Sequence, residues 1–254
     1  MNGGRILASP TLWVGLFFAL LLMRMEALRP LFQRAFPGVE PAMYQRSSFL
    51  ALFLSHLALV AAASLAAISV GLSLAVFVTR PVGQDFRLMV NTLATVGQTL
   101  PPAAVLAIAV PAVGFGSRPT VLALFLYGLL PIIASAIAGL EGVPRAVREA
   151  AAGLGLSSWQ QLREVELPLA APVILSGIRV SVTIAIGTAT IGSTVGALTF
   201  GTPIFDGLVA DKLPFVIEGA VLVALFAIVT DLSFAGLERW LRRETRQAVS
   251  ETSR

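Results

Sequence analysis

The sequence predicts an all-α membrane protein with about six transmembrane helices. Its 254 residues are 56% hydrophobic and only 13% charged, and the mean hydropathy is +0.86. These values leave too few polar side chains to cover a water-soluble globule of this length. Apolar stretches of about 20 residues recur along the chain, which is what a helix needs to cross a hydrocarbon layer of roughly 30 Å. Helices also pair their own backbone groups, as the bilayer requires.

Six segments are long and apolar enough to span: 6–23, 49–78, 88–113, 119–138, 171–196 and 215–236. The first begins near Arg5 and also fits a secretory signal peptide, but Arg24-Met25-Glu26-Ala27 follows it without a small-x-small cleavage site. We therefore expect a retained span. The second and third segments exceed the required length, so a tilted or interfacial turn is expected in each. Pro101-Pro102 predicts a kink or break in the third.

A polar segment at 149–168, EAAAGLGLSSWQQLREVELP, lies between the fourth and fifth spans. Glu149 and the alanines after it favour a short helix, and Gly155 can end that helix in a left-handed conformation. Ser157 and Gln160 have the spacing of a capping box, which would start a second helix across 159–165. Pro168 is expected to limit this helix before the fifth span. The segment therefore predicts a helix, a glycine turn and a helix.

This pattern of Glu149-Ala150-Ala151, then Gly155, then Val165-Glu166-Leu167-Pro168 resembles the cytoplasmic docking loop of binding-protein-dependent ABC importer permeases. Val165 stands where that family usually has Ile. The resemblance implies the type I ABC importer permease fold, with a helix-turn-helix coupling loop at 139–170 that inserts into a cleft of the ATP-hydrolysing subunit. It assigns this coupling role to six residues: Glu149, Ala150, Ala151, Gly155, Leu167 and Pro168. The alternative is an ordinary cytoplasmic hairpin with solvated charges.

Further segments resemble osmoprotectant permeases, which import glycine betaine, choline or carnitine. They are 98–101, 124–131, 165–169, 177–179 and 187–190. Two departures leave the exact solute and the transport competence of this copy open. Leu198-Thr199 replaces a glycine pair after Val195-Gly196-Ala197, and Ala134-Ser135-Ala136 stands where Arg-Asn-Thr is usual. Both departures fall where they would alter a gate or a pathway lining.

The distribution of basic residues favours an orientation with both termini inside. In that orientation the cytoplasmic segments hold eleven of them: Arg5, Arg80, Arg87, Arg145, Arg148, Arg163, Arg239, Arg242, Arg243, Arg246 and Arg254. The outer segments hold six: Arg24, Arg29, Arg34, Arg46, Arg118 and Lys212. The first outer loop is an exception to the rule, offset in part by Glu26 and Glu40. The reverse orientation would place the denser basic segments outside.

The fifth span carries the candidate translocation pathway. Small residues recur at every fourth position, namely Gly177, Ser181, Ala185, Ala189, Ser193 and Ala197, and Gly192 and Gly196 form a Gly-x-x-x-Gly pair. Such ridges let helices approach closely in lipid. The candidate pathway residues are Arg179, Thr183, Thr188, Thr190, Ser193 and Thr194. The alternative is a packing helix whose hydroxyls bond to its own backbone.

Four ionisable residues fall within the spans, where burial of charge is costly: His56, Arg179, Glu218 and Asp231. We expect Arg179, which starts the fifth span, to pair with Asp231 of the sixth. Snorkelling or pairing at helix ends is the alternative for all four.

The chain has no internal route to ATP. A Walker-type phosphate loop needs Gly-Lys-Ser/Thr, and the only lysine, Lys212, lies between Asp211 and Leu213. The single histidine, His56, excludes a His-Glu-x-x-His metal site, and the absence of cysteine excludes disulfides and thiolate metal sites. No catalytic residue, metal or cofactor is therefore expected. The net charge of +4 is explained by topology and anionic lipid rather than by nucleic acid.

We therefore predict a single permease domain over 1–254 in the inner membrane of a prokaryote, with a core at 50–236 and a cytoplasmic tail at 237–254. By resemblance it imports a small osmoprotectant through ATP-driven alternating access. The implied partners are an ATP-binding subunit, an extracytoplasmic solute-binding protein, a second identical or different permease copy, and lipid. Three alternatives stay open: another small solute such as an amino acid, an ion-coupled secondary transporter, and an intramembrane hydrolase that would pair a serine with His56.

Overall fold

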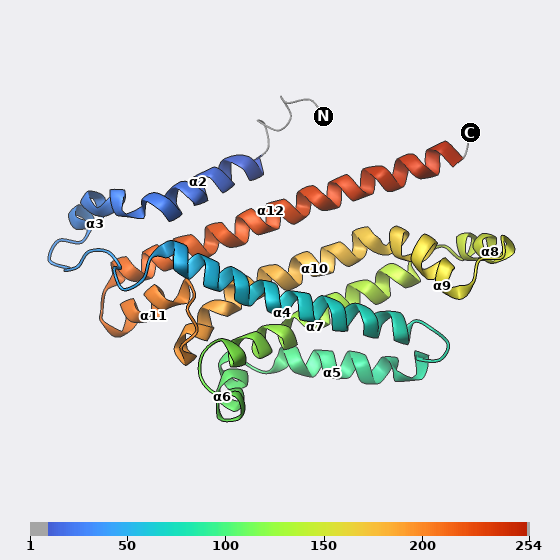
Figure 1. Ribbon diagram of the computed structural model, residues 1–254, viewed down its shortest axis with the longest axis horizontal. Coiled ribbons are helices and arrows are strands. Elements are labelled where there is room, and N and C mark those ends of the chain that lie inside the picture. The colour runs from blue at the N-terminus through green and yellow to red at the C-terminus, as the bar shows by residue number, and fades with distance from the viewer. Residues whose placement is uncertain (1–9, 253–254) are drawn as a thin grey trace. The chain divides into compact units, whose positions relative to one another are not determined.

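The computed structural model describes residues 10–252, with side chains up to Leu241. Every regular element in this range is a helix (Figure 1). The predicted topogenic residues Arg5 and Arg254 lie outside the described residues, as do the side chains of Arg242, Arg243 and Arg246. The predicted all-α class is confirmed.

Five helical segments in the described range are long and apolar enough to cross a membrane: Pro10–Ala35, Phe49–Val78, Ser117–Glu141, Ser158–Val195 and Leu213–Leu241. A sixth span is formed if α5 (Arg87–Thr99) and α6 (Pro102–Val113) are counted together. The number of spans therefore agrees with the predicted six. The second, α4 (Phe49–Val78), has the predicted bounds because an unbroken apolar run fills it.

The predicted break at Pro101-Pro102 is present, and the helix axes of α5 and α6 differ by 97°. Leu100 is extended, with ψ 132°, because a residue before proline is crowded out of the helical region. Pro102 then opens α6, a position where its missing N–H costs nothing.

The fifth span differs from its prediction at its far end. The α-helix α10 (Leu167–Ala189) is followed by the tighter 3₁₀ turn η4 (Thr190–Val195), which ends on Gly196 at φ 87°. The small-residue stripe therefore follows one α-helical face only as far as Ala189. Beyond it the tighter winding shifts Ser193 off that line, and Ala197 follows the left-handed Gly196 outside the helix, so the predicted continuous ridge does not extend there.

The chain divides into two compact units. Among the described residues, the first comprises 10–63, 101–124 and 183–233. It contains α2 (Pro10–Arg24), η1 (Met25–Leu28), α3 (Arg29–Ala35), α6 and α11 (Gly201–Val209). Its core is an aromatic cluster in which the ring of Phe53 lies 5.4 Å from Phe18 and 5.3 Å from Phe226. Phe200 is fully buried and packs against the same group.

The segment between α3 and α4 is tied to the last part of the first unit by three polar contacts. The backbone N–H of Tyr44 donates to Glu218 at 2.9 Å, and Arg46 pairs with Asp206 at 3.2 Å. Lys212 donates to a backbone carbonyl of the same segment at 2.5 Å.

The second unit comprises the described residues 64–100, 125–182 and 234–252. It contains η2 (Gln84–Phe86), α5, α8 (Arg145–Gly153), α9 (Ser158–Gln160) and the π-helical turn η3 (Gln161–Glu166). The helices α4, α7 (Ser117–Glu141), α10 and α12 (Leu213–Thr252) contribute residues to both units. Within the second unit α7 buries Ile133, Ala136, Ile137 and Leu140, at the spacing of one helical face.

The helices α7 and α10 pack closely in the second unit. A Cβ on Gly177 would collide with the Ser135 side chain and with the carbonyl of Pro131. Ser135 itself donates its hydroxyl to the Pro131 carbonyl. This serine belongs to the Ala134-Ser135-Ala136 departure, so that stretch has a packing role in this protein.

Candidate functional site

The first helix of the polar segment, α8, carries the Glu149-Ala150-Ala151 pattern. It begins directly after Pro144, four residues earlier than the sequence indicated. Ala151 is buried, whereas Glu149 and Ala150 are exposed. Arg145 donates to Glu149 at 2.6 Å, but both side chains are mostly exposed, and such a pair contributes little stability. The Glu149 carboxylate is therefore available at the surface.

The glycine turn predicted after α8 is present. Gly155 has φ 78°, in the left-handed region. Its N–H donates to the Ala152 carbonyl at 2.9 Å, and the next N–H, of Leu156, reaches back to Ala151 at 3.2 Å. This pair of bonds is a Schellman motif, which closes a helix end by satisfying its last carbonyls. The motif fixes the direction in which the chain leaves α8.

The predicted capping box is also present. The Ser157 hydroxyl accepts the Gln160 N–H at 3.3 Å, and the Gln160 side chain accepts the Ser157 N–H at 2.9 Å. The second helix therefore starts at a defined residue. Together with the Schellman motif, this box gives the segment the predicted helix-turn-helix form.

The second helix does not end before Pro168. It runs through α9 and the π-helical turn η3 directly into α10, so the predicted limit at Pro168 is wrong. A proline ring inside a regular α-helix collides with the carbonyl four residues earlier. The wider π turn directly before Pro168 displaces those carbonyls and removes that conflict. The turn also places Leu162 and Glu166 inside the protein.

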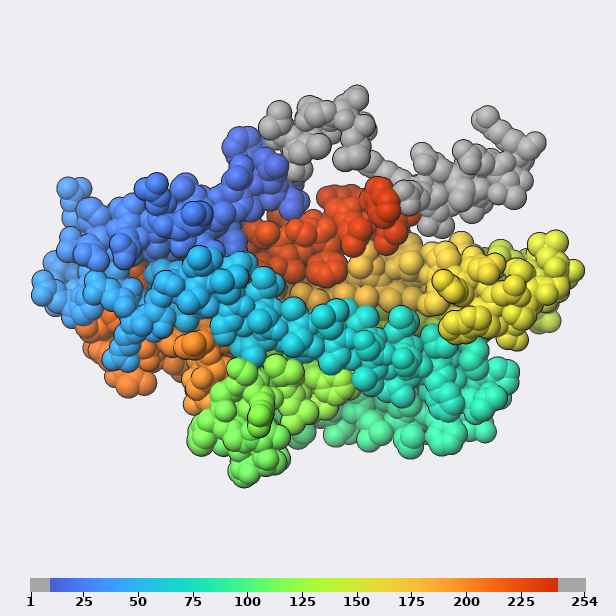
Figure 2. All heavy atoms as spheres, viewed as in Figure 1, coloured from blue at the N-terminus to red at the C-terminus, as the bar shows by residue number. Residues whose placement is uncertain are grey.

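The outer surface of this loop, residues 142–166, exposes apolar and small residues among its charged and polar ones. Leu154 is 82% exposed and Trp159 is 65% exposed. Ala150, Ala152 and Gly153 are exposed beside them. Figure 2 shows the atoms of the loop, in yellow, uncovered on the side in view. Exposed apolar side chains on a fixed backbone are typical of a protein interaction site.

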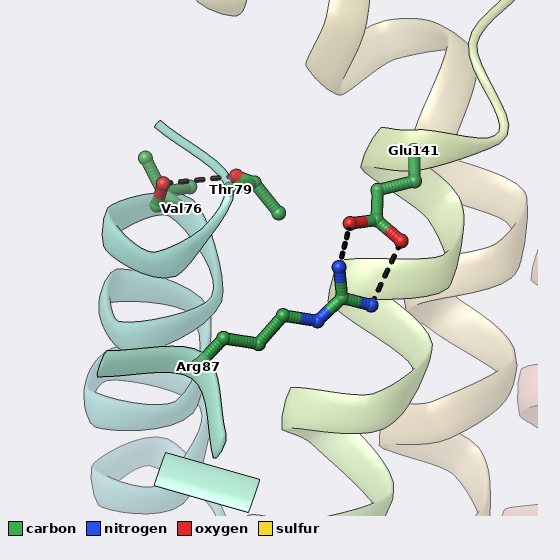
Figure 3. Close-up of polar contacts among 4 residues, drawn as sticks. All are labelled: Val76, Thr79, Arg87 and Glu141. Atoms are coloured by element: carbon green, nitrogen blue, oxygen red, sulfur yellow. Dashed lines mark hydrogen bonds and ion pairs between the residues drawn. The ribbon is translucent and has the colours of Figure 1, made fainter. Parts of the chain in front are cut away.

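Two ion pairs hold the ends of the loop, and the sequence reasoning did not identify them. Glu166 is 3% exposed and accepts from Arg80 at 2.5 Å. Glu141 receives both terminal nitrogens of Arg87 (Figure 3). The sequence reasoning treated these arginines only as topological signals. The signal available was the position of a carboxylate at each end of the loop next to an apolar span, where a charge needs a partner.

The structure distributes the candidate pathway residues over two kinds of helix. Thr183 and Thr188 lie in α10, whereas Thr190, Ser193 and Thr194 lie in η4. The last three donate their hydroxyls to carbonyls three residues earlier at 2.7, 2.8 and 2.7 Å. Bonding of this kind is what the packing alternative expects, and a role in the pathway stays a prediction.

Arg179 of α10 lies 3.7 Å from Glu238 of α12 in an ion pair. Sequence reasoning missed this partner because Glu238 falls beyond the predicted end of the sixth span. The predicted pairing of Arg179 with Asp231 stays a prediction.

His56 is fully buried and both of its ring nitrogens face backbone groups. Nδ1 accepts the Phe200 N–H at 3.2 Å, which leaves Nε2 to donate to the Ile186 carbonyl at 3.1 Å. These bonds fix one neutral tautomer. Because both nitrogens are occupied, His56 holds the core together and is not placed to activate a serine.

Comparison with known proteins agrees with the family resemblance of the helix-turn-helix loop. The family described as binding-protein-dependent transport system inner membrane component matches residues 67–243. The osmoprotectant import permease protein OsmY of Salmonella typhimurium is 41% identical over 208 residues, which are 82% of this chain and 88% of that protein. The glycine betaine/carnitine/choline transport system permease protein OpuCB of Bacillus subtilis is 40% identical over 156 residues, 61% of this chain and 72% of that one.

Solved structures share the fold at lower identity. An inward-facing MetNI methionine ABC transporter has a TM-score of 0.68 at 18% identity, covering 76% of this chain and 95% of that one. An amino acid ABC transporter has a TM-score of 0.58 at 21% identity, covering 77% and 95%. With its helix-turn-helix loop, its apolar helices of spanning length and these relatives, the chain belongs to the family of binding-protein-dependent transport system inner membrane components and has the type I fold of ABC importer permeases.

Proposed function

We propose that this permease moves a small osmoprotectant of the glycine betaine, choline or carnitine class. The observation that carries the proposal is the 41% identity to an osmoprotectant import permease over 88% of that protein's length. Relatives named for glycine betaine, carnitine and choline transport support the same class. The solved transporters named for methionine or other amino acids share only 18–21% identity with this chain. At that identity they support the fold assignment but not an assignment of the solute.

Membership of the family implies two partners, an ATP-binding subunit and a substrate-binding protein. We place the ATP-binding subunit on the loop at 142–166, because its exposed apolar residues lie on a backbone fixed by the Schellman motif and the capping box. The coupling residues are then Glu149, Ala150, Ala151 and Gly155 on the loop, with Leu167 and Pro168 at its junction with α10.

This assignment also orients the chain. The docking loop joins the end of α7 to the start of α10, so these two helix ends face the cytoplasm. Counting spans from there puts both termini inside and the substrate-binding protein against the opposite face. A second permease copy, identical or different, completes the transporter.

Transport in this proposal is alternating access driven by the partner. ATP binding draws the ATP-binding subunits together and moves the docking loops, and the spans change between inward and outward openings. Arg179 and the threonines of α10 and η4 remain the candidate lining of the pathway. An ion-coupled transporter would instead act without the ATP-binding subunit.

Reconstitution tests the proposal. The permease is co-expressed with its ATP-binding subunit and binding protein, placed in liposomes, and assayed for ATP-dependent uptake of glycine betaine, choline and carnitine, with methionine as the competing amino acid. We expect uptake of at least one quaternary amine and none of methionine. Uptake by the permease alone without ATP would refute the importer, and uptake of methionine would refute the solute class.

A substitution in the loop tests the docking surface. Leu154→Asp places a charge at a side chain that is 82% exposed, so the fold should tolerate it while the ATP-binding subunit no longer co-purifies. Val209→Asp is the matched control, because Val209 is 89% exposed on α11 and outside the loop. Equal loss of the subunit from both variants would contradict the placement.

A further inference from the structure

Both ends of the docking loop are attached to one short connection elsewhere in the same unit. Glu141 closes α7 just before the loop, and Glu166, the last residue of the loop, closes the π turn. Their partners, Arg80 and Arg87, both belong to the segment 79–87, which comprises the connection after α4 and the first residue of α5. We call this segment the 79–87 turn.

The pair at the first end of the loop is bidentate. Arg87 places its two terminal nitrogens on the two oxygens of Glu141, one of them at 3.0 Å (Figure 3). Two parallel bonds fix the orientation of the groups as well as their distance. Both side chains are 44% exposed. At that exposure an ion pair contributes little to folding, so its geometry matters more than its stabilisation.

The pair at the second end is buried on the acidic side. Glu166 is almost fully enclosed, and Arg80 reaches it at 2.5 Å while remaining 29% exposed. The Nε atom of Arg80 is buried without a hydrogen-bond partner. Removing Arg80 would leave an enclosed carboxylate without its counter-charge, which proteins tolerate poorly.

The 79–87 turn is itself held by local hydrogen bonds. Three successive backbone bonds brace it, from Arg80 to Phe77 at 3.1 Å, from Gly83 to Arg80 at 3.0 Å, and from Phe86 to Gly83 at 3.0 Å. The Thr79 hydroxyl caps the end of α4 by donating to Val76 at 2.9 Å (Figure 3). Gly83 lies so close to the Phe77 carbonyl that any Cβ there would collide with it.

We propose that the 79–87 turn is a clamp that passes movement of the docking loop to α4 and α5. The inference rests on the proposed docking of an ATP-binding subunit. The loop is covalently joined only to α7 and α10, and the two arginines extend its attachment to two further helices. Because both ends of the loop are held by one turn, the loop moves together with four helices rather than two. Arg80 and Arg87 act as positioning residues, since neither lies on the docking surface.

Charge reversal in the assembled transporter tests the clamp. Arg87→Glu and Glu141→Arg are made singly and together, and both solute uptake and ATP hydrolysis are measured in liposomes. Mutations at residues that link two coupled sites change the coupling by about 0.5–2 kcal/mol, so each single variant should lower the uptake per ATP hydrolysed by roughly 2- to 30-fold. Co-purification of the ATP-binding subunit should not change. The double variant should restore the ratio.

A matched pair outside the turn is the control. Arg46 and Asp206 form an ion pair of 3.2 Å in the first unit, and reversing both charges there should leave the ratio unchanged. A covalent replacement separates positioning from charge. The chain has no cysteine, so Arg87→Cys with Glu141→Cys can be joined by a bifunctional thiol reagent of matching length. Linking should raise the uptake per ATP hydrolysed above that of the unlinked protein.

The clamp is overturned if the single variants keep the wild-type ratio, or if neither the double reversal nor the thiol link restores it. A different result would show that the proposed function, and not the clamp, is wrong. In that case the wild-type permease itself fails to retain the ATP-binding subunit. Gel filtration of each variant checks that it folds, and Arg87→Lys, which keeps the charge but loses the bidentate geometry, should give an intermediate ratio.

Discussion

The Gly155 turn offers a prediction in which one physical cost can be isolated. Gly155 lies at φ 78°, and a Cβ built on it would meet no atom within 4 Å. Gly155→Ala therefore adds no steric contact, and its whole cost is the left-handed backbone, which is about 1–2 kcal/mol for a residue with a Cβ. That energy corresponds to a roughly 5- to 30-fold change in the equilibrium between closed and open turns.

Gly153 is the matched control, two residues earlier. It also has open space around its Cβ position, but it lies in the last turn of α8 with ordinary helical geometry. Gly153→Ala should therefore stabilise the helix by about 0.5–1 kcal/mol. The same chemical change at the two glycines is expected to act in opposite directions.

Hydrogen exchange of the purified permease measures both effects. The Leu156 N–H closes the Schellman motif by donating to Ala151, so its protection reports on the turn. Protection should fall by roughly 5- to 30-fold in Gly155→Ala and rise by roughly 2- to 5-fold in Gly153→Ala. A change of the same sign in both variants would refute the argument, because it would show that the left-handed conformation does not set the stability of the turn.

Three further outcomes are expected. His56→Phe should lower the unfolding free energy by about 1–3 kcal/mol, since the buried N–H of Phe200 loses its acceptor, and thermal unfolding in detergent measures this. Gly177→Ala should destabilise by about 1–3 kcal/mol by overpacking α10 against α7, whereas Gly187→Ala, with no atom within 4 Å, should not; equal melting shifts would contradict this. Ser157→Ala should cost about 0.5–2 kcal/mol of local stability through loss of the capping box, visible as faster exchange of the Gln160 N–H, while Ser157→Asp should retain it.

Local chemistry explains which features could be predicted from the sequence. The α4 bounds follow from an unbroken apolar run, and the bend at Pro101 follows from the restriction that proline places on Leu100. The turn at Gly155 and the cap at Ser157 each involve residues at most five positions apart. In all of these the interacting groups are neighbours in the sequence, so a short window contains the full cause.

The features that sequence reasoning missed depend on distant partners or on small changes in winding. Arg80 and Glu166 are 86 positions apart, and Arg87 and Glu141 are 54 apart, so no local pattern joins them. The π turn at 161–166 preserves an ordinary helical composition while changing its hydrogen bonding. The end of α10 at Ala189 could not be predicted for the same reason, because the composition does not change there. Hydroxyl residues occur both in α10 and in the 3₁₀ turn that follows it.

The capping box and Schellman motif also bear on the thermodynamics of subunit assembly. Binding loses conformational entropy, because the side chains that make the contact become immobilised. This costs about 0.5–1.5 kcal/mol for each flexible side chain. A segment that folds only on its partner also loses backbone entropy. A loop whose backbone is already fixed avoids that second cost. An isolated peptide of residues 142–168 would carry the same contact groups yet have to order its backbone on binding, so it should compete poorly with the permease for the ATP-binding subunit.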